Sequence, residues 1–301
     1  MDPLADLTAT RVDRPAALTI GVFDGVHTGH RYLMDQVRAA AKRDGLAAGV
    51  VTFRNHPATV LAPHIPHTYL CSVDERLALL RDTGVDYVVP VTFTKELSQL
   101  RARDFVDALV KRVRMKRLLC GPDFALGKGR EGTVPVLESL GREMGFAVEH
   151  VKPLVRDGMV ISSTAVREAL KAGNIRLATS LLGRRYRLNG PVVKGDQRGR
   201  TLGFPTANIA VDAYYALPAD GIYATVAHID GKAFDSATNI GVRPTFGVLG
   251  RTVEAYIMDF SGDLYGKHVD LEIVERLRPE ERFASVDALI AQMHRDVAAA
   301  R

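Results

Sequence analysis

Two histidines, at positions 27 and 30, stand in a glycine-rich stretch whose residue types suit phosphate chemistry. Residues 21–30 read Gly-Val-Phe-Asp-Gly-Val-His-Thr-Gly-His. Glycines let the backbone bend and let a ligand come close to the chain. Two imidazoles three residues apart can lie on one side of a first helical turn, and their N–H groups can stabilise charge that develops on phosphate oxygens. The stretch predicts a phosphate-transfer site, with the candidate residues Gly21, Phe23, Asp24, Gly25, His27 and His30.

The neighbouring segments predict a strand before this stretch and a helix after it. Residues 16–20 form a short apolar run typical of a buried strand. Leu33, Met34, Val37 and Ala40 fall on one helical face. A helix start presents unpaired N–H groups and a partial positive charge, so a strand-to-helix turn here suits a phosphate. An ordinary glycine turn with two solvated histidines is the weaker alternative, because so many suitable residues fall together at fixed spacing.

Strands and helices alternate through the rest of the first half. Further strands are predicted at 47–53, 86–91, 118–120 and 146–151, with helices at 74–81, 103–113 and 133–145. This alternation predicts a doubly wound α/β domain with a parallel sheet. Ligands of such sheets bind at the carboxyl ends of the strands. We therefore expect the 21–30 turn to meet residues 54–57, which include His56, and residues 121–124, which include Asp123.

A second polar motif covers residues 161–167, which read Ile-Ser-Ser-Thr-Ala-Val-Arg. Ser162, Ser163 and Thr164 precede a predicted helix over 165–172. Hydroxyl groups, a helix start and the guanidinium of Arg167 could together grip triphosphate oxygens. Plain N-capping by a hydroxyl residue is the alternative for this motif.

The second half has a different pattern. Strands are predicted at 186–193, 221–232, 234–240, 252–258 and 268–274, with glycine or proline between them. Alternating apolar and polar residues in these runs predict an antiparallel sheet or small β-barrel. An apolar stripe over 286–297 predicts a C-terminal helix. We place the domain boundary near Gly183, giving domains over 1–183 and 184–301.

A glycine-rich segment over 194–208 joins the first two of these predicted strands. It contains Gly195, Gly199 and Gly203, the cations Arg198 and Arg200, and the final sequence Leu-Gly-Phe-Pro-Thr-Ala-Asn. The segment is rich in backbone N–H groups that could meet a phosphate, and a flexible surface loop is the alternative. Glu254 stands within a predicted strand, where a lone glutamate is usually solvent-facing.

Together these motifs resemble those of bifunctional riboflavin kinase/FAD synthetases of the prokaryotic type. The 21–30 stretch and the Ile-Ser-Ser-Thr-x-x-Arg motif resemble FAD synthetases, as does Thr-Phe followed by His-Pro over 52–57. The Pro-Thr-Ala-Asn motif, residues 239–246 and residues 252–260 resemble riboflavin kinases. The resemblance implies a Rossmann-like nucleotidyltransferase domain followed by a β-barrel kinase domain.

The same resemblance implies two reactions. The second domain would transfer the γ-phosphoryl group of ATP to riboflavin, giving FMN, and the first would transfer AMP from ATP to FMN, giving FAD and pyrophosphate. It implies that Thr206 and Asn208 ligate Mg²⁺ bound to ATP, and that Glu254 is the catalytic base for the riboflavin hydroxyl. Gly195, Arg200 and Gly203 would also contact the ATP of the kinase.

The sequence departs from the family pattern in two places. Residues 121–127 read Gly-Pro-Asp-Phe-Ala-Leu-Gly, where FAD synthetases usually have Asn in place of Asp123. Asp keeps an acceptor and removes a donor. Residues 253–256 read Val-Glu-Ala-Tyr instead of the commoner Val-Glu-Thr-His, which leaves Glu254 unchanged.

Composition limits the alternatives. Of 301 residues, 47% are hydrophobic and 25% charged, with a net charge of +5, which fits phosphorylated substrates and does not require nucleic acid. No apolar run reaches membrane-spanning length, and two cysteines make no disulfide framework, so we expect a cytoplasmic protein. The basic run over 111–117 is interpreted as a helix end.

Two other functions stay open at this point. One is a single-activity adenylyltransferase whose second domain only binds flavin. The other is a nucleic-acid-binding protein that uses the basic run. The sequence does not determine the oligomeric state.

Overall fold

The computed structural model describes residues 2–9, 12–195, 198–245 and 248–301. Within these ranges the side chains of residues 9, 198, 200, 243–245 and 248–250 are not described. The chain forms two compact units. The first contains residues 1–67 and 72–162, and the second contains residues 68–71 and 163–301.

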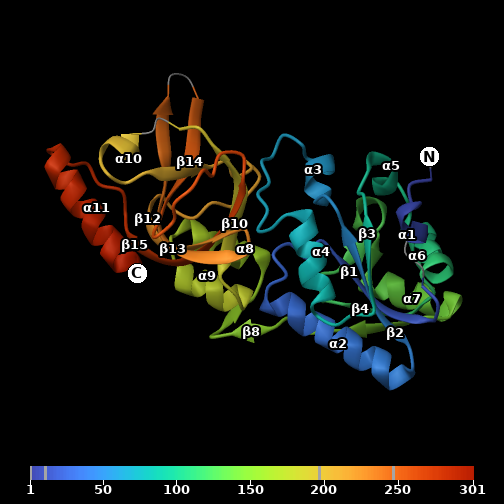
Figure 1. Cartoon of the computed structure of the whole chain (residues 1–301). Coiled ribbons are helices and arrows are strands. Elements are labelled where there is room, and N and C mark those ends of the chain that lie inside the picture. Colours follow the sequence, from blue (N-terminus) through green and yellow to red (C-terminus); the bar gives the residue numbers. More distant parts are fainter. Residues whose placement is uncertain (1, 10–11, 196–197, 246–247) are drawn as a thin grey trace. The chain divides into compact units, whose positions relative to one another are not determined.

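The first unit is built on a five-stranded parallel sheet with the order β3-β2-β1-β4-β7 (Figure 1). Its strands are β1 (Ala16–Gly21), β2 (Ala47–Phe53), β3 (Tyr87–Val91), β4 (Met115–Cys120) and β7 (Ala147–His150). β1 and β2 are apolar and almost wholly buried, as expected of central parallel strands. The strand order reverses between β1 and β4, which is where such sheets bind ligands.

Helices cover both faces of this sheet. They are α1 (Asp6–Ala9), α2 (Thr28–Asp44), α3 (Pro57–Leu61), α4 (Val73–Arg81), α5 (Lys95–Ser98), α6 (Ala102–Arg112), η1 (Lys128–Arg130) and α7 (Val134–Met144). Phe105 of α6 and Leu137 of α7 pack in one core with Leu18 of β1. Val37 of α2 packs in another core with Ala17, the next residue of β1. Because successive strand residues point to opposite faces, this confirms the predicted doubly wound arrangement.

Short elements of this unit lie outside the sequence prediction. Two hairpins consist of two-residue strands: β5 (Ala125–Leu126) with β6 (Gly132–Thr133), and β8 (Val155–Arg156) with β9 (Met159–Val160).

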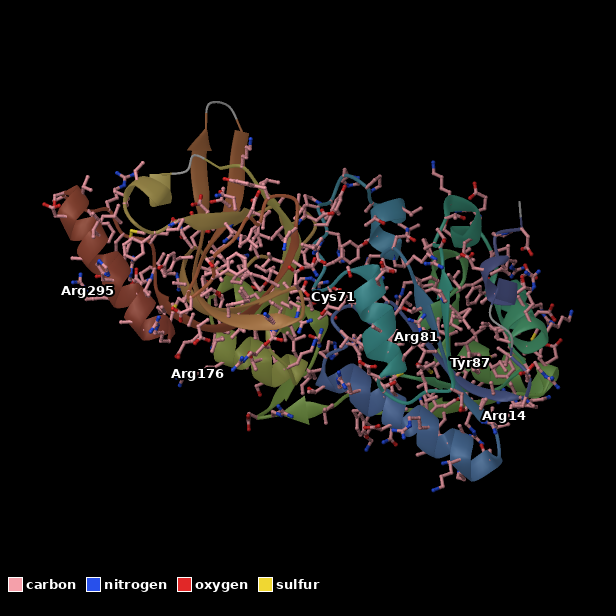
Figure 2. The ribbon with its side chains drawn as sticks, viewed as in Figure 1. Arg14, Cys71, Arg81, Tyr87, Arg176 and Arg295 are labelled. Atoms are coloured by element: carbon pink, nitrogen blue, oxygen red, sulfur yellow. The ribbon has the colours of Figure 1, made fainter. Side chains whose placement is uncertain are left out.

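Within the main sheet, Gly49 lies opposite Tyr87 and leaves room for the tyrosine ring, since a Cβ at Gly49 would overlap that ring (Figure 2 labels Tyr87).

The second unit is a closed six-stranded antiparallel barrel with the order β10-β11-β14-β13-β12-β15. Its strands are β10 (Tyr186–Val193), β11 (Thr206–Ile209), β12 (Gly221–Ile229), β13 (Lys232–Thr245), β14 (Val248–Ile257) and β15 (His268–Arg278). The short helix α10 (Arg198–Thr201) and the C-terminal helix α11 (Val286–Ala300) complete it. The barrel and the C-terminal helix were both predicted, whereas β11 lies in the segment taken for a loop.

Two further helices, α8 (Ser163–Lys171) and α9 (Ile175–Leu182), belong to the barrel unit. α9 packs on β10 and β15, and the N–H of Ala219 donates to the carbonyl of Leu170 at 2.9 Å. The segment 68–71 joins the same unit, because Tyr69 exchanges backbone hydrogen bonds with Tyr214 and Ala216 at 2.6 and 2.9 Å. Compact packing therefore divides the chain at Ser162, while the functional boundary near Gly183 stays a prediction.

Cys71 and Cys120 are both buried and free, and Cys71 is labelled in Figure 2. Burial raises the pKa of the Cys120 thiol to about 11. In the part of the chain that the structure describes, no helix combines the length and apolarity needed to cross a membrane.

Candidate active sites

The turn after β1 has an unusual backbone. Phe23, Gly25 and Val26 have φ values of 54°, 76° and 38°. Bulky and β-branched residues rarely adopt positive φ, and such strained residues cluster at ligand sites. Phe23, Asp24, Gly25, Val26 and His27 are all buried, so the surrounding packing holds this conformation in place. The glycines alone do not explain the turn.

Gly21 and Gly29 serve a different purpose from the one predicted. Neither has a positive φ; each makes room for neighbouring protein atoms. A Cβ on Gly21 would lie 2.9 Å from the ring of Phe23, and a Cβ on Gly29 would lie 3.0 Å from the carbonyl oxygen of Ile161. Close packing of the turn against Phe23 and Ile161 therefore requires glycine at both positions.

His27 and His30 lie together as their spacing predicts. Their rings are stacked, with centroids 3.5 Å apart and planes inclined by 19°. His27 is the N-cap of α2, and its Nδ1 atom accepts a hydrogen bond from the backbone N–H of His30 at 3.2 Å. Because Nδ1 is an acceptor, a neutral His27 carries its proton on Nε2. Both rings stand at the start of a 17-residue helix, where the helix dipole favours an anion.

His30 is held in its neutral form. Burial, and then the neighbouring His27 and Arg76, keep the pKa of His30 well below its usual value. Its Nδ1 atom is buried and has no hydrogen-bond partner among the described residues. The ring also contacts Phe23 edge to face at 5.2 Å between centroids. A neutral imidazole in a fixed position can still donate a hydrogen bond to a phosphate oxygen.

Two more strand ends lie at the same edge of the sheet, because β2, β1 and β4 are adjacent and parallel. After β2, Asn55 exchanges two hydrogen bonds of 2.9 Å with the backbone of Phe93, beyond β3. His56 is the N-cap of α3 and its ring stacks on His67 at 3.9 Å between centroids. After β4, Asp123 is exposed, and its carbonyl accepts from Arg130 at 2.8 Å. This meets the expectation that the three segments converge.

Arg76 of α4 is a site residue that the sequence reasoning missed. It is only 1% exposed, and its Nη1 and Nη2 atoms donate to the carbonyls of Val22 at 3.0 Å and Arg54 at 2.8 Å. Those carbonyls belong to the turns after β1 and β2. A signal was present, because Arg76 lies on the same helical face as the apolar residues Val73, Leu77 and Leu80.

The second polar motif is divided between the units. Ile161 and Ser162 belong to the first, where the Ile161 carbonyl packs on Gly29. α8 begins at Ser163, two residues before the predicted start at Ala165, so Ser163 and Thr164 lie in its first turn. Ser163, Thr164 and Arg167 belong to the second unit. There the Nε of Arg167 donates to the carbonyl of Thr68 at 2.8 Å. A part for these three residues in ATP binding stays a prediction.

In the barrel, strand register brings Glu254 beside two asparagines. Glu254 of β14 lies opposite Asn208 of β11 and opposite Asn239 of β13. Directly opposite residues of antiparallel strands point to the same face, with Cβ atoms about 4.5–5.5 Å apart. Ala207 and Ala255, which flank this row, are buried towards the barrel interior, so the row lies on the outer face. The side chain of Asn239 has a buried Oδ1 atom with no hydrogen-bond partner among the described residues.

The glycine-rich segment packs on this row. A Cβ on Gly195 would overlap the side-chain amide of Asn208, so the bare backbone of Gly195 forms a cradle over that amide. Thr206 and Asn208 are two residues apart on β11 and therefore share a face. Gly203 has a φ of 86°. The Arg200 side chain lies outside the described part of the structure.

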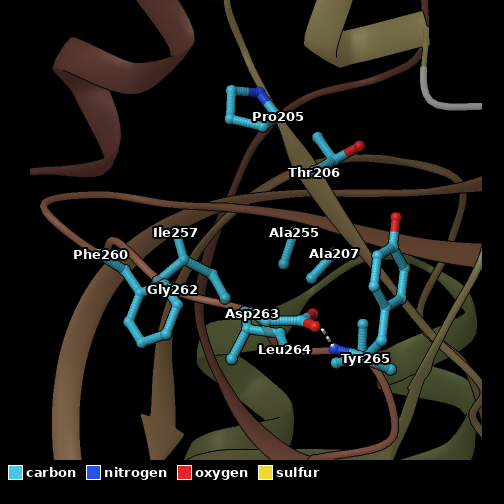
Figure 3. A pocket seen from close by; sticks show the side chains of 11 residues that line it. Pro205, Thr206, Ala207, Ala255, Ile257, Phe260, Gly262, Asp263, Leu264 and Tyr265 are labelled. Carbon is cyan, nitrogen blue, oxygen red and sulfur yellow. Dashed lines mark hydrogen bonds between the residues drawn. The ribbon is translucent and has the colours of Figure 1, made fainter.

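A pocket of about 490 Å³ opens beside Thr206, where β11 diverges from β10 after only two paired positions (Figure 3). Its walls include Ala207, Ala255 and Ile257, and the aromatic residues Phe260 and Tyr265 stand on either side. The pocket is large enough for a small organic ligand, and its lining combines apolar side chains with the polar groups of Thr206 and Asp263. No local sequence pattern marks this pocket, because its walls come from three separate segments.

Three of the five cations in the basic run over 111–117 have acidic partners. Only Lys111 and Arg112 close α6, whereas Lys116 and Arg117 belong to β4. Lys111 pairs with Asp107 at 2.8 Å, Arg112 with Asp2 at 2.6 Å and Arg117 with both Asp44 and Glu149 at 2.6 and 3.0 Å. The run offers less free positive charge than its sequence suggests.

Family models match both halves of the chain. The model described as FAD synthetase matches residues 9–165, and the model described as riboflavin kinase matches residues 182–301. The chain belongs to the bifunctional riboflavin kinase/FMN adenylyltransferase family.

Relatives cover nearly the whole chain. The bifunctional riboflavin kinase/FMN adenylyltransferase of Escherichia coli K12 is 41% identical over 94% of this chain and 91% of its own. The protein of that name from Pseudomonas fluorescens is 38% identical over 96% and 93%. A solved structure from Streptococcus pneumoniae, titled as a macrolide-efflux protein, matches with a TM-score of 0.89 and 30% identity over 98% of this chain and 96% of that one. The family and fold predicted from the motifs are thus confirmed.

Proposed function

We propose that this member of the bifunctional riboflavin kinase/FMN adenylyltransferase family catalyses both steps, making FMN in the barrel unit and FAD in the first unit. The observation that supports the kinase step best is the register of Glu254 with Asn208 and Asn239. It sets a carboxylate between two amide side chains on one face of the barrel wall. The family match over both halves supports the assignment of the two activities.

In the kinase reaction, the 5′-hydroxyl oxygen of riboflavin forms a bond to the γ-phosphorus of ATP while the bond to the β,γ-bridging oxygen breaks and ADP leaves. Glu254 accepts the hydroxyl proton. ATP lies on the β11 side of Glu254, next to Thr206 and Asn208. Riboflavin then approaches from the β13 side, next to Asn239, so that donor and acceptor are in line.

Mg²⁺ fits the β11 side of the row formed by Asn208, Glu254 and Asn239. Thr206 and Asn208 supply hard oxygen donors on one face, and the missing side chain of Gly195 leaves Asn208 enough room. When bound, Mg²⁺ would neutralise charge on the transferring phosphates. Thr206 and Asn208 hold and orient this group, and Gly195 keeps the Asn208 amide in place.

In the adenylyl transfer, a phosphate oxygen of FMN forms a bond to the α-phosphorus of ATP and pyrophosphate leaves. The N–H groups at the start of α2 and the stacked imidazoles of His27 and His30 face the phosphates at the turn after β1. These groups orient the triphosphate and stabilise charge on the transferred and leaving oxygens, so no protein nucleophile is required. His56 and Asp123 line the flavin or nucleotide side of the same sheet edge.

Product analysis after incubation with riboflavin, ATP and Mg²⁺ tests the proposal. We expect FMN and ADP first, followed by FAD and pyrophosphate. A chain that makes FAD from added FMN but leaves riboflavin unchanged would be a single-activity adenylyltransferase with a flavin-binding second domain. Salt-sensitive binding of nucleic acid without flavin turnover would instead favour a nucleic-acid-binding protein that uses the basic run over 111–117. The cytoplasmic location stays a prediction.

Gly195→Ala is expected to slow FMN formation by about tenfold or more and to leave FAD formation from FMN unchanged. The added methyl group would overlap the Asn208 amide and move a proposed Mg²⁺ ligand. Steady-state rates at increasing Mg²⁺ measure the effect, and the variant should require more Mg²⁺ for half-maximal rate. Gly231→Ala, at a β-turn glycine with no atoms near its missing Cβ, is the control for strain alone. Normal FMN formation and Mg²⁺ dependence in Gly195→Ala would contradict the assignment of Asn208.

A further inference from the structure

Arg76 is a buried cation for which the protein supplies no counter-charge. Its side chain is held inside the first unit by α4, whose neighbouring residues Leu77 and Leu80 are part of a hydrophobic core. Among the described residues, no carboxylate forms an ion pair with it, and its buried Nε atom has no hydrogen-bond partner. Within the described part of the chain, its guanidinium donates only to two carbonyl oxygens, those of Val22 and Arg54.

Two other partly buried arginines, Arg278 and Arg117, are paired with carboxylates. Arg278, whose side chain is 15% exposed, makes a two-pronged pair with Asp296 at 2.9 and 2.7 Å. Arg117 pairs with two carboxylates. Burying an unpaired charge is costly, and a low-dielectric interior strengthens the attraction of that charge for an anion. Arg76 differs from Arg278 and Arg117 in being almost fully buried, at 1% exposure, without a carboxylate partner among the described residues.

The position of Arg76 identifies the kind of ligand. Val22, whose carbonyl also accepts a hydrogen bond from the hydroxyl of Thr52 at 3.0 Å, begins the turn that leads to His27 and His30. The positive charge of Arg76 reaches His30, where it helps to lower the pKa of that ring. The arginine thus lies behind the proposed phosphate site and fixes the turns after β1 and β2 against each other.

We propose that Arg76 is a positioning residue for adenylyl transfer, whose buried guanidinium holds the β1 and β2 turns together and attracts the phosphates of ATP and FMN to them. Arg76 does not touch the substrate, because both Nη atoms are used by carbonyl oxygens and the side chain is buried. This inference rests on the proposed function of the first unit and adds a residue to it.

Two full-length variants test the role of Arg76: Arg76→Lys keeps the charge, and Arg76→Gln keeps a donor for one carbonyl without the charge. The control is Arg81→Met, which removes an exposed cation from the last turn of the same helix (Figure 2). We expect Arg76→Gln to lower kcat/KM for FAD formation by about 10²-fold and Arg76→Lys by about tenfold or less. FMN formation in the same preparations should be unchanged, and Arg81→Met should match the parent protein.

Titration calorimetry with inorganic pyrophosphate provides a readout that needs no turnover. Arg76→Gln should bind pyrophosphate about tenfold more weakly than Arg76→Lys. This comparison does not depend on turnover. If the parent protein made no FAD, the proposed function would be overturned, but the binding comparison would still test the role of Arg76. Equal rates and equal pyrophosphate affinities in folded Lys and Gln variants would overturn the role of the charge. If Arg76→Gln does not fold, Arg76→Lys alone tests the proposal. Full loss of FAD formation in a folded Arg76→Lys variant would show that the positive charge is not what matters at this position.

Discussion

Replacing Glu254 by glutamine is expected to abolish FMN formation, with a loss of about 10²–10⁴ in rate. Glutamine keeps the size of the side chain and its place between Asn208 and Asn239, but it cannot accept the proton of the riboflavin hydroxyl. FAD formation from added FMN should continue, because that reaction belongs to the other unit. Chromatography of the flavins after incubation with riboflavin or with FMN measures both rates.

Glu275→Gln is the matched control for this variant. Glu275 is another strand glutamate of the barrel, half exposed, and its one ion-pair partner in the described part of the chain is the exposed Arg176 at 2.9 Å. A surface pair of this kind contributes little to stability, so the control should make FMN at the parent rate. A folded Glu254→Gln variant that forms FMN normally would remove Glu254 from the mechanism and leave the barrel without a proposed base.

His30→Ala is expected to slow FAD formation from FMN and ATP by about 10²–10³, while FMN formation from riboflavin stays close to that of the parent protein. The reason is the position of the ring, stacked on His27 at the start of α2 and held neutral by burial. Removing it deletes a fixed donor at the site of charge development. Flavin chromatography and pyrophosphate release give the two rates independently.

The control is His150→Ala, which removes an exposed histidine from β7 of the same unit. Because the His30 ring also packs on Phe23, thermal unfolding of both variants must show that they are folded at the assay temperature. Loss of both activities to the same degree in a folded His30→Ala variant would contradict the assignment of His30 to one site only.

Local sequence patterns predicted the strands and helices whose burial is regular along their length. β1 and β2 are buried on both faces and read as apolar runs. The spacing of His27 and His30 predicted their common side because it lies within one helical turn. By contrast, β11 has only four residues and follows a segment rich in glycine, so no periodic signal marks it.

Features that depend on distant residues could not be predicted in this way. The row of Asn208, Glu254 and Asn239 results from strand register across the barrel, which local periodicity does not fix. The positive φ of Phe23 and Val26 is imposed by surrounding packing against the preference of those residues. The membership of α8 and α9 in the barrel unit likewise depends on tertiary contacts, although the helical pattern of α8 was evident.

The central claim is that one chain performs two separate phosphorus transfers, and isotopic labelling of ATP tests it most directly. Parent protein is incubated with riboflavin and Mg²⁺ and with ATP labelled at either the γ- or the α-phosphorus, and the flavins are separated over time. We predict that γ-label enters FMN and is carried into FAD, whereas α-label enters FAD and never FMN. Unlabelled flavin from γ-labelled ATP, or FAD without α-label, would contradict the account.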